Sequence, residues 1–204
     1  MKNLLLIVFT ALTLSDCSKN NDILQTPQDQ LPPITTIGAN TAGCIINGKV
    51  LIPKNGINGI SGYPIYGLVT YAGPNFSSPD FNDYYAIKIM NLKDKGLNYS
   101  VYVHLNNINA GAINYTVGQS NGEYFIDGPN TPHIIVQEFN NNIFTGKLFL
   151  SIASYGIIKI NRFDYPNHII SGTFNCTLYN KDNNAETISV SDGRFDINTA
   201  TLNQ

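Results

Sequence analysis

Alternating apolar and polar residues recur through most of this chain after residue 42, and this pattern limits the fold more than any other feature. In a β-strand, successive side chains point to opposite faces of the sheet, so alternate residues share a face. The clearest apolar face, in 169–179, consists of Ile170, Gly172, Phe174, Cys176 and Leu178. No stretch after residue 42 has the spacing of an amphipathic helix. The sequence therefore predicts an all-β fold.

The predicted strands follow one another at short intervals, with residues typical of turns between them. They cover 44–52 as a hairpin on Asn47-Gly48, then 65–71, 85–89, 99–105, 113–117, 123–126, 134–139, 146–154, 156–163, 169–179 and 186–197. Short connections favour antiparallel pairing of neighbouring strands. We therefore expect an antiparallel β-sandwich or a flattened β-barrel over 43–204, in which the last four strands form a continuous meander.

The last of these strands changes register near its middle. Its first apolar residues, Ile188 and Val190, occupy even positions. Those that follow, Phe195 and Ile197, occupy odd positions. A β-bulge at Asp192-Gly193 would absorb the extra residue, because glycine accepts a positive φ. The alternative is that the strand ends there and the chain turns.

Residues 1–17 have the pattern of a lipoprotein signal peptide. Lys2 supplies a positive charge, 4–14 form an apolar run, and Cys17 stands at the place of a lipobox cysteine, although Asp16 replaces the small residue usual before it. The apolar run is shorter than the roughly 20 residues that a membrane-spanning helix needs. We therefore predict that the mature chain begins at Cys17 and carries acyl chains there, palmitate among them. The alternative is an ordinary secretory signal in which Cys17 is incidental.

The segment 18–42 is polar, contains Pro27, Pro32 and Pro33, and shows no period. This composition predicts a flexible, disordered tether between the signal peptide and the domain. The remaining residues, 43–204, are enough for a single all-β domain with its own core.

Charge argues against one class of partner. Charged residues make up only 13% of the chain, the net charge is -2, and no block of basic residues occurs, which argues against nucleic-acid binding. The expected partners are a membrane, reached through the lipid anchor, and an envelope protein or polysaccharide.

Two cysteines remain besides Cys17. In an exported protein, Cys44 and Cys176 are able to form a disulfide. The alternation places Cys176 in the core. The predicted hairpin instead places Cys44 on the face of Lys49 and leaves Ile45 and Val50 to face the core. The pattern therefore leaves both the bonded and the free state open.

The sequence holds one pattern of a hydrolase nucleophile. Residues 118–122 match G-x-S-x-G, in which a strand precedes the serine and a helix follows it. Here a strand is predicted at 123–126, so we interpret Ser120 as a loop residue without a base. The histidines His104, His133 and His168 lack the spacing of metal ligands, and His104 falls on the polar face of its strand. We expect no metal and no cofactor.

Three acids are candidates for a catalytic pair. Asp164, Asp192 and Asp196 lie near Arg162 and Arg194 in the last third of the chain. Two carboxylates of this kind serve a glycosidase when they flank a shared cleft. The alternative is structural: Asp164 and Asp192 occupy turn-like contexts, and Arg194 forms an ion pair with Asp164 or Asp196.

Four segments carry a resemblance to a known family. They are 38–50, 156–164, 170–174 with the motif I-S-G-T-F, and 192–196 with the motif D-G-R-F-D. Together they resemble a family of uncharacterised Bacteroidota-type envelope lipoproteins with a domain of unknown function. The resemblance implies a place in the cell envelope, anchored to the outer membrane, and implies no activity and no catalytic residues.

These observations favour a lipid-anchored cell-envelope protein that acts as a non-enzymatic binding or accessory module. A secreted hydrolase, glycosidase-like with a carboxylate pair, is the alternative. A purely structural envelope protein is a third interpretation.

Overall fold

One antiparallel sheet holds the strands of the computed structural model, which describes residues 26–57, 62, 64–73, 84–94, 98–108, 113–140 and 142–204. The elements are, in chain order, η1 (Pro27–Gln30), β1 (Thr41–Ile46), β2 (Lys49–Leu51), β3 (Leu68–Ala72), β4 (Tyr84–Met90), β5 (Tyr99–Asn106), β6 (Asn114–Thr116), η3 (Phe125–Asp127), β7 (His133–Asn140), β8 (Asn142–Asp164), β9 (Ile169–Asn180) and β10 (Asn183–Asn198), where η marks a 3-10 helix. Within these ranges, no helix has both the length and the apolar character needed to cross a membrane.

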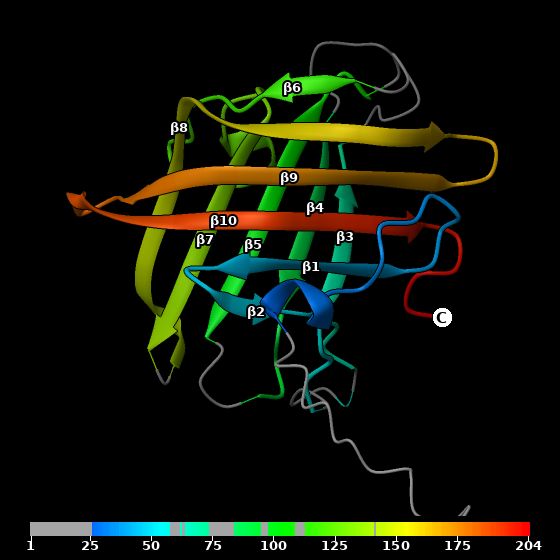
Figure 1. Cartoon of the computed structure of the whole chain (residues 1–204), viewed down its shortest axis with the longest axis horizontal. Coiled ribbons are helices and arrows are strands. Elements are labelled where there is room, and N and C mark those ends of the chain that lie inside the picture. Colours follow the sequence, from blue (N-terminus) through cyan, green and yellow to red (C-terminus); the bar gives the residue numbers. More distant parts are fainter. Residues whose placement is uncertain are drawn as a thin grey trace, which may run out of the picture.

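The sheet curls over on itself into a half-barrel. Its strand order is β2-β1-β10-β9-β8-β7-β5-β4-β3, and β6 pairs with β8. In Figure 1, β9, β10 and β1 run across the front of the molecule, and β7, β5, β4 and β3 cross behind them at a steep angle. The two layers are parts of one continuous sheet. The predicted antiparallel all-β class is therefore confirmed.

Strand β8 joins the two layers. Residues up to Leu150 pair with β7. Residues 149–151 and 156–164 pair with β9, with a shift of register between Ser151 and Gly156. Ser154, inside this interval, has a φ of 70°. Figure 1 shows β8 bending from the rear layer into the front layer. The separate strands predicted at 146–154 and 156–163 are thus one bent strand, and the C-terminal meander is confirmed as β8-β9-β10.

The main core lies between the two layers. On β9 the predicted apolar face is buried, including Ile170, Phe174 and Leu178. The same cluster contains alternate residues of the rear strands, namely Tyr85, Ile87, Ile89, Val101, Val103, Leu105, Ile134 and Val136. Full burial of one large aliphatic side chain contributes about 1.5–3 kcal/mol, so this cluster is the main source of stability.

The I-S-G-T-F and D-G-R-F-D motifs lie side by side and interlock. Gly172 pairs with Phe195, and Gly193 pairs with Phe174, across β9 and β10. A Cβ on Gly193 would lie 2.5 Å from the Phe174 ring, and one on Gly172 would lie 2.6 Å from the Phe195 ring. Each glycine therefore makes room for the phenylalanine of the other motif.

The predicted β-bulge is also confirmed. The register of β10 shifts between Val190 and Gly193 while the strand continues to Asn198. The positive φ, 52°, belongs to Asp192 and not to Gly193 as predicted. Asp192 tolerates this conformation because its short polar side chain bonds locally, here to the Ser191 hydroxyl. Gly193 is needed for close packing instead.

Substitution of Gly172 tests this interlocking. A Cβ there would lie 2.4 Å from the Lys159 carbonyl oxygen, which is backbone and cannot turn aside. We expect Gly172→Ala to lower the free energy of unfolding by about 2 kcal/mol, as overpacking of a close-packed core does. Urea unfolding measures the change. Gly48→Ala is the control, because its Cβ would meet nothing within 4 Å and only its φ of 80° opposes the substitution. Equal effects of the two substitutions would contradict the close approach.

The outer side of the rear layer is covered as well. The segment 117–132 packs over it. Two partly buried residues of this segment, Tyr124 and Phe125, pack against a second cluster of buried residues, which consists of Tyr84, Ala86, Tyr102, Ile135 and Leu150. The prediction of a strand at 123–126 is wrong, because the chain there enters the 3-10 helix η3 at Phe125. Phe125 has a φ of 56°, and its N–H donates to the Tyr102 hydroxyl at 3.0 Å instead of to a neighbouring strand.

The tether predicted at 18–42 needs a correction. Residues 18–25 lie outside the described residues. From Thr26 to Asn40, a segment that we call the strap, the chain lies against the outer side of the front layer, before β1 begins at Thr41. Leu31 is only 7% exposed, and a Cβ on Gly43 would lie 3.0 Å from its side chain. The strap is thus part of the domain.

Candidate functional site

Ser120 lies in a loop, as predicted. Its side chain is 1% exposed, and its hydroxyl accepts a hydrogen bond from the Gly122 N–H at 3.1 Å. Its own N–H donates to the Ser151 carbonyl. Among the described hydrogen bonds, none joins a histidine ring to the Ser120 hydroxyl. This arrangement satisfies the hydroxyl locally and supplies none of the neighbours of a nucleophilic serine.

Two histidines lie together in the second cluster. His104 is 1% exposed and His133 is fully buried, so the expectation that His104 falls on a polar face is wrong. The two residues pair across β5 and β7, and their rings stack with centroids 4.5 Å apart. Tyr84 stacks on the other side of His104 at 5.3 Å. Sequence reasoning missed the pair because residues 29 positions apart meet only through the strand register.

Hydrogen bonds indicate that both rings are neutral. The His133 Nδ1 donates to the Thr131 carbonyl at 2.8 Å, and its Nε2 is buried without a partner among the described residues. His104 lies 3.4 Å from the Tyr102 hydroxyl and from the Asn130 amide oxygen. Burial lowers the pKa of His104 to about 4, helped by the neighbouring His133. Burial also lowers the pKa of His133.

The candidate acids serve separate structural roles, and the first is Asp164. Its carboxylate accepts hydrogen bonds from the Asn167 backbone and side chain and from the Arg162 guanidinium at 2.5 Å. The Asn167 amide and then Arg162 hold the pKa of the Asp164 carboxyl below its usual value. Asp164 is thus a turn acid, as the structural interpretation predicted, but its ion pair is with Arg162 and not with Arg194.

Asp196 binds the strap. Its carboxylate accepts hydrogen bonds from the Thr35 hydroxyl at 2.6 Å and from the N–H groups of Ile37, Gly38 and Ala39 at 3.0, 2.7 and 3.2 Å. Asp196 is 2% exposed. Burial by itself raises the pKa of this carboxyl, but the hydrogen bonds outweigh it and the pKa is lowered. The ion pair expected from the sequence is replaced by a cradle of backbone donors.

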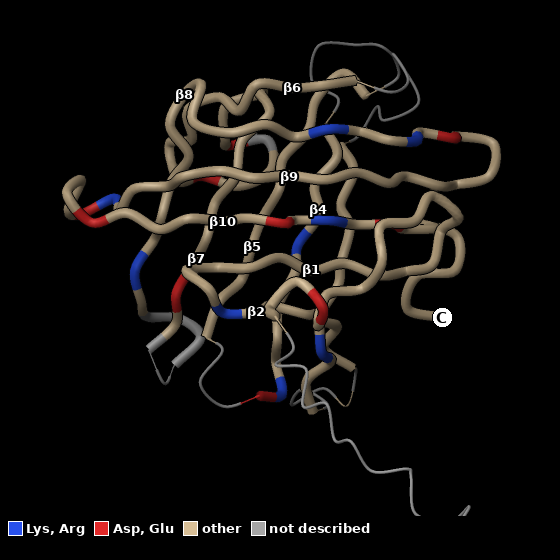
Figure 2. Tube along the Cα trace, in the orientation of Figure 1, with Lys and Arg blue, Asp and Glu red and all other residues tan. Residues whose placement is uncertain are grey.

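The remaining charges of this region also contact the strap. Arg194 donates to the Pro32 carbonyl at 3.2 Å and lies 3.9 Å from Asp192. Arg162 donates to the Thr36 carbonyl at 2.7 Å. Figure 2 shows these charges spread along β8 and β10 instead of gathered at one point. Within the described residues, no group of three or more His, Cys, Asp or Glu side chains is placed to hold a metal ion.

The disulfide between Cys44 and Cys176 that the sequence left open is not formed, and both thiols are free. Strand β10 lies between their strands, because Val190 pairs with Cys176 on one side and with Ile46 on the other. Two strand spacings amount to about 10 Å, beyond the roughly 7 Å that a disulfide spans between Cα atoms.

The face of Cys44 also differs from the prediction. Cys44 pairs with Leu51, which confirms the register of the hairpin. Both residues lie in the main core with Ala42 and Ile46. The alternation of apolar residues predicted the wrong core face because Ile45, on the opposite face, is also buried, at 4% exposure.

Thiol titration checks this result. The Cys17→Ala protein, kept without reductant, should show almost no reactive thiol when folded and two when unfolded in guanidinium. Burial explains the first value, since it raises the pKa of each thiol to about 12. Cys44→Ser should remove one of the two. Absence of reactive thiols in the unfolded, unreduced protein would instead demonstrate the disulfide.

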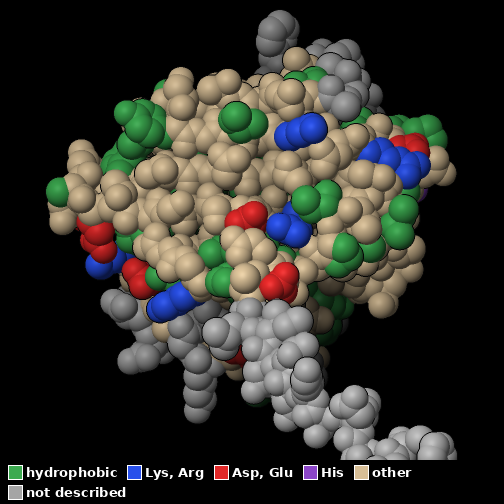
Figure 3. All heavy atoms as spheres, in the orientation of Figure 1, with side chains coloured by type: hydrophobic (Ala, Val, Ile, Leu, Met, Phe, Trp, Pro, Cys, Tyr) green, Lys and Arg blue, Asp and Glu red, His purple; other side chains and the backbone are tan. Residues whose placement is uncertain are grey.

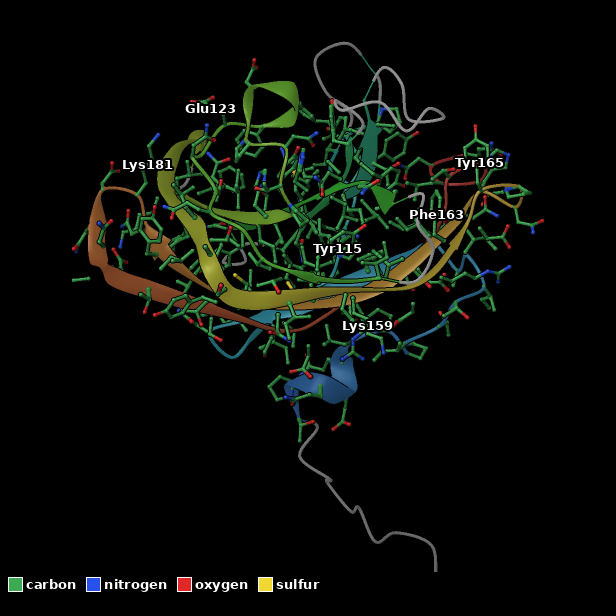
Figure 4. All side chains as sticks on the ribbon, turned by 90° about the horizontal axis from the view of Figure 1, so that it is seen from above. Tyr115, Glu123, Lys159, Phe163, Tyr165 and Lys181 are labelled. Carbon is green, nitrogen blue, oxygen red and sulfur yellow. The ribbon has the colours of Figure 1, made fainter. Side chains whose placement is uncertain are left out.

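A small pocket opens at the end of the half-barrel near the turn between β8 and β9. Its volume is about 130 Å³, and it is lined by Tyr85, Phe163, Asp164, Tyr165, His168, Ile169, Ile170 and Thr199. Figure 4 shows Phe163 and Tyr165 together at this end of the curved sheet. An apolar cavity of about 150 Å³ holds one benzene molecule. The described lining therefore fits a small apolar group, such as one ring or one branched side chain.

Of this lining, the sequence analysis considered Asp164 as a catalytic acid and His168 as a metal ligand, and placed Ile170 in the core. The lining residues come from β4, β8, the turn between β8 and β9, β9 and the segment after β10, so only the folded sheet brings them together. The predicted lipidation site, Cys17, lies outside the described residues.

Comparison with models of protein families, with curated proteins and with solved structures found no match.

Proposed function

We propose that this chain is a lipid-anchored, non-enzymatic binding or accessory module of the cell envelope, tethered to the outer membrane through Cys17 and in contact there with an envelope protein or polysaccharide. The signal pattern of residues 1–17 and the resemblance to envelope lipoproteins motivate the location.

One structural observation carries the non-enzymatic part of the proposal. Asp196 bonds four donors of the strap, and Asp164 bonds a turn and an arginine. A glycosidase needs two carboxyls that face a shared cleft and are free to meet a sugar. Both acids are instead committed to holding the fold. The apolar pocket is where a binding partner could insert one side chain or ring.

Replacement of the lipobox cysteine tests the anchor. Cys17→Ala should move the protein from the membrane fraction to the soluble fraction of the envelope, because the acyl chains supply the binding energy, about 0.8 kcal/mol per buried methylene. Fractionation followed by immunoblotting measures this. Cys176→Ser, which leaves the lipobox intact, should stay in the membrane fraction. A Cys17→Ala protein that remains membrane-bound with its signal uncleaved would contradict the anchor.

A hydrolase screen tests the alternative. The purified protein should turn over neither aryl glycosides nor esters, and a fluorophosphonate probe should leave Ser120 unlabelled because its hydroxyl is buried. Glycoside turnover that disappears in Asp164→Asn or Asp192→Asn, with the fold retained by circular dichroism, would establish the glycosidase instead.

A further inference from the structure

The strap fixes the point at which the chain leaves the domain. It is bound along its length: Gln28 contacts Asp192, Pro32 accepts from Arg194, and the Asn40 side chain accepts from the Asn198 N–H at 2.8 Å. The four donors to Asp196 lie between these contacts. In Figure 1 the strap and η1 lie in front of β10, β1 and β2. Whatever precedes Thr26 therefore departs from the front face of the half-barrel.

The distance from this face to the predicted lipid anchor is short. Residues 18–25 separate Cys17 from Thr26. Such a segment spans at most about 30 Å even when fully extended, at roughly 3.3–3.6 Å per residue. If the face opposite the strap lay on the bilayer, the strap would be far from the acyl chains. The short segment between Cys17 and Thr26 therefore favours an orientation in which the strap is near the bilayer.

The strap also presents apolar side chains outward. Ile34 is 56% exposed and Ile37 is 70% exposed, although Ile34 directly precedes the segment bound by Asp196 and the Ile37 N–H is one of its donors. Figure 3 shows hydrophobic side chains on this face among charges of both signs. Exposed isoleucines on a segment that leads directly to a lipid anchor have a natural environment in the interfacial region of a bilayer.

We propose that the strap face, formed by the strap and the outer side of β8, β9, β10 and β1, lies on the membrane with Ile34 and Ile37 in the lipid interface. The proposal rests on the lipid anchor proposed above and specifies how the domain is oriented. The opposite side, which carries Glu123 and the second cluster, then faces away from the membrane and is accessible to a partner. Figure 4 shows Lys159 on the same side of the sheet as η1, and Glu123 on the opposite side.

Fluorescence quenching in vesicles tests the orientation. The lipidated protein is reconstituted into phosphatidylcholine vesicles that contain spin-labelled lipid, with an environment-sensitive dye attached at Lys159→Cys, Ile37→Cys or Glu123→Cys. All three positions are exposed, and the buried Cys44 and Cys176 do not compete for the dye. We expect quenching to be about threefold stronger at positions 37 and 159 than at 123, because interfacial groups sit about 5–10 Å into the headgroup region.

A second part of the experiment releases the strap from the domain. Asp196→Asn in the Lys159→Cys protein removes the negative charge that holds the strap, and the longer free segment lets the domain move away. Its quenching should fall to the level of the Glu123→Cys protein, provided circular dichroism shows the native fold. Equal quenching at 37, 159 and 123 in protein that floats with the vesicles would overturn the orientation. Protein that fails to float would overturn the anchor itself, and the orientation with it.

Discussion

Asp196→Ala should lower the free energy of unfolding by about 4 kcal/mol and free the strap. Hydrogen bonds to a charged group contribute about 1.5–3 kcal/mol each, and Asp196 accepts four, three of them from backbone N–H groups. The loss is smaller than their sum because the released N–H groups then bond to water. At roughly 2–4 °C for each kcal/mol in a domain of this size, the melting temperature should fall by about 10 °C.

Two measurements check this result. Urea unfolding gives the free energy, and limited proteolysis reports cleavage between Leu31 and Asn40, which should become fast only in the variant. Asp164→Ala is the matched control, because the Asp164 carboxylate also accepts several hydrogen bonds, from Arg162 and Asn167, but none from the strap. We expect Asp164→Ala to lose much less stability than Asp196→Ala, because ion pairs near the surface are screened by water and contribute little. A strap that stays protected in Asp196→Ala would show that Leu31 and the other contacts hold it without the carboxylate.

The last third of the chain was the most predictable part of the fold. On β9, the core side is buried along its length, whereas most of the outer side from Thr173 to Tyr179 is partly or fully exposed. The alternation from Ile170 to Leu178 therefore indicates both that the segment is a strand and which of its faces lies in the core. The bulge at Asp192-Gly193 was predictable for the same reason, because the core residues before it occupy even positions and those after it occupy odd positions. Such signals are local, since each strand carries them in its own sequence.

The strap and the second cluster were not predictable, because their causes are not local. Asp196 meets Thr35 across 161 residues of sequence, and nothing in the polar segment 26–40 distinguishes a bound strap from a free tether. On β5, every residue from Tyr99 to Leu105 is buried, because the segment 117–132 covers the outer side. The prediction that His104 lies on an exposed, polar face is wrong because this segment buries the outer side of the strand.

Acidification should destabilise the protein in two separate steps, and the first comes from the histidine pair. An unfolded histidine has a pKa near 6.5, whereas that of His104 in the folded protein is about 4 and that of His133 is also lowered. Between these values the unfolded chain binds protons that the folded protein does not, so stability is full above pH 6.5 and falls as the pH drops toward 4. Asp196 acts only below this window, since its folded pKa is lowered and its contribution is lost as the pH falls through that value.

The histidine step should be large enough to isolate. For His104, a difference of about 2.5 pKa units corresponds to about 3 kcal/mol at 1.36 kcal/mol per unit, and His133 adds to it. Urea unfolding at pH 7 and pH 4.5 measures the loss. His104→Phe keeps a stacked ring between Tyr84 and His133 but removes the titrating group, so it should be less stable at pH 7 and lose less on acidification. The opposite outcome is an equal loss of stability in His104→Phe and in the unmodified protein between these pH values. It would mean that the buried pair is protonated without opening the segment 117–132. The inference that both rings are neutral, drawn from their contacts with Thr131 and Tyr102, would then be wrong.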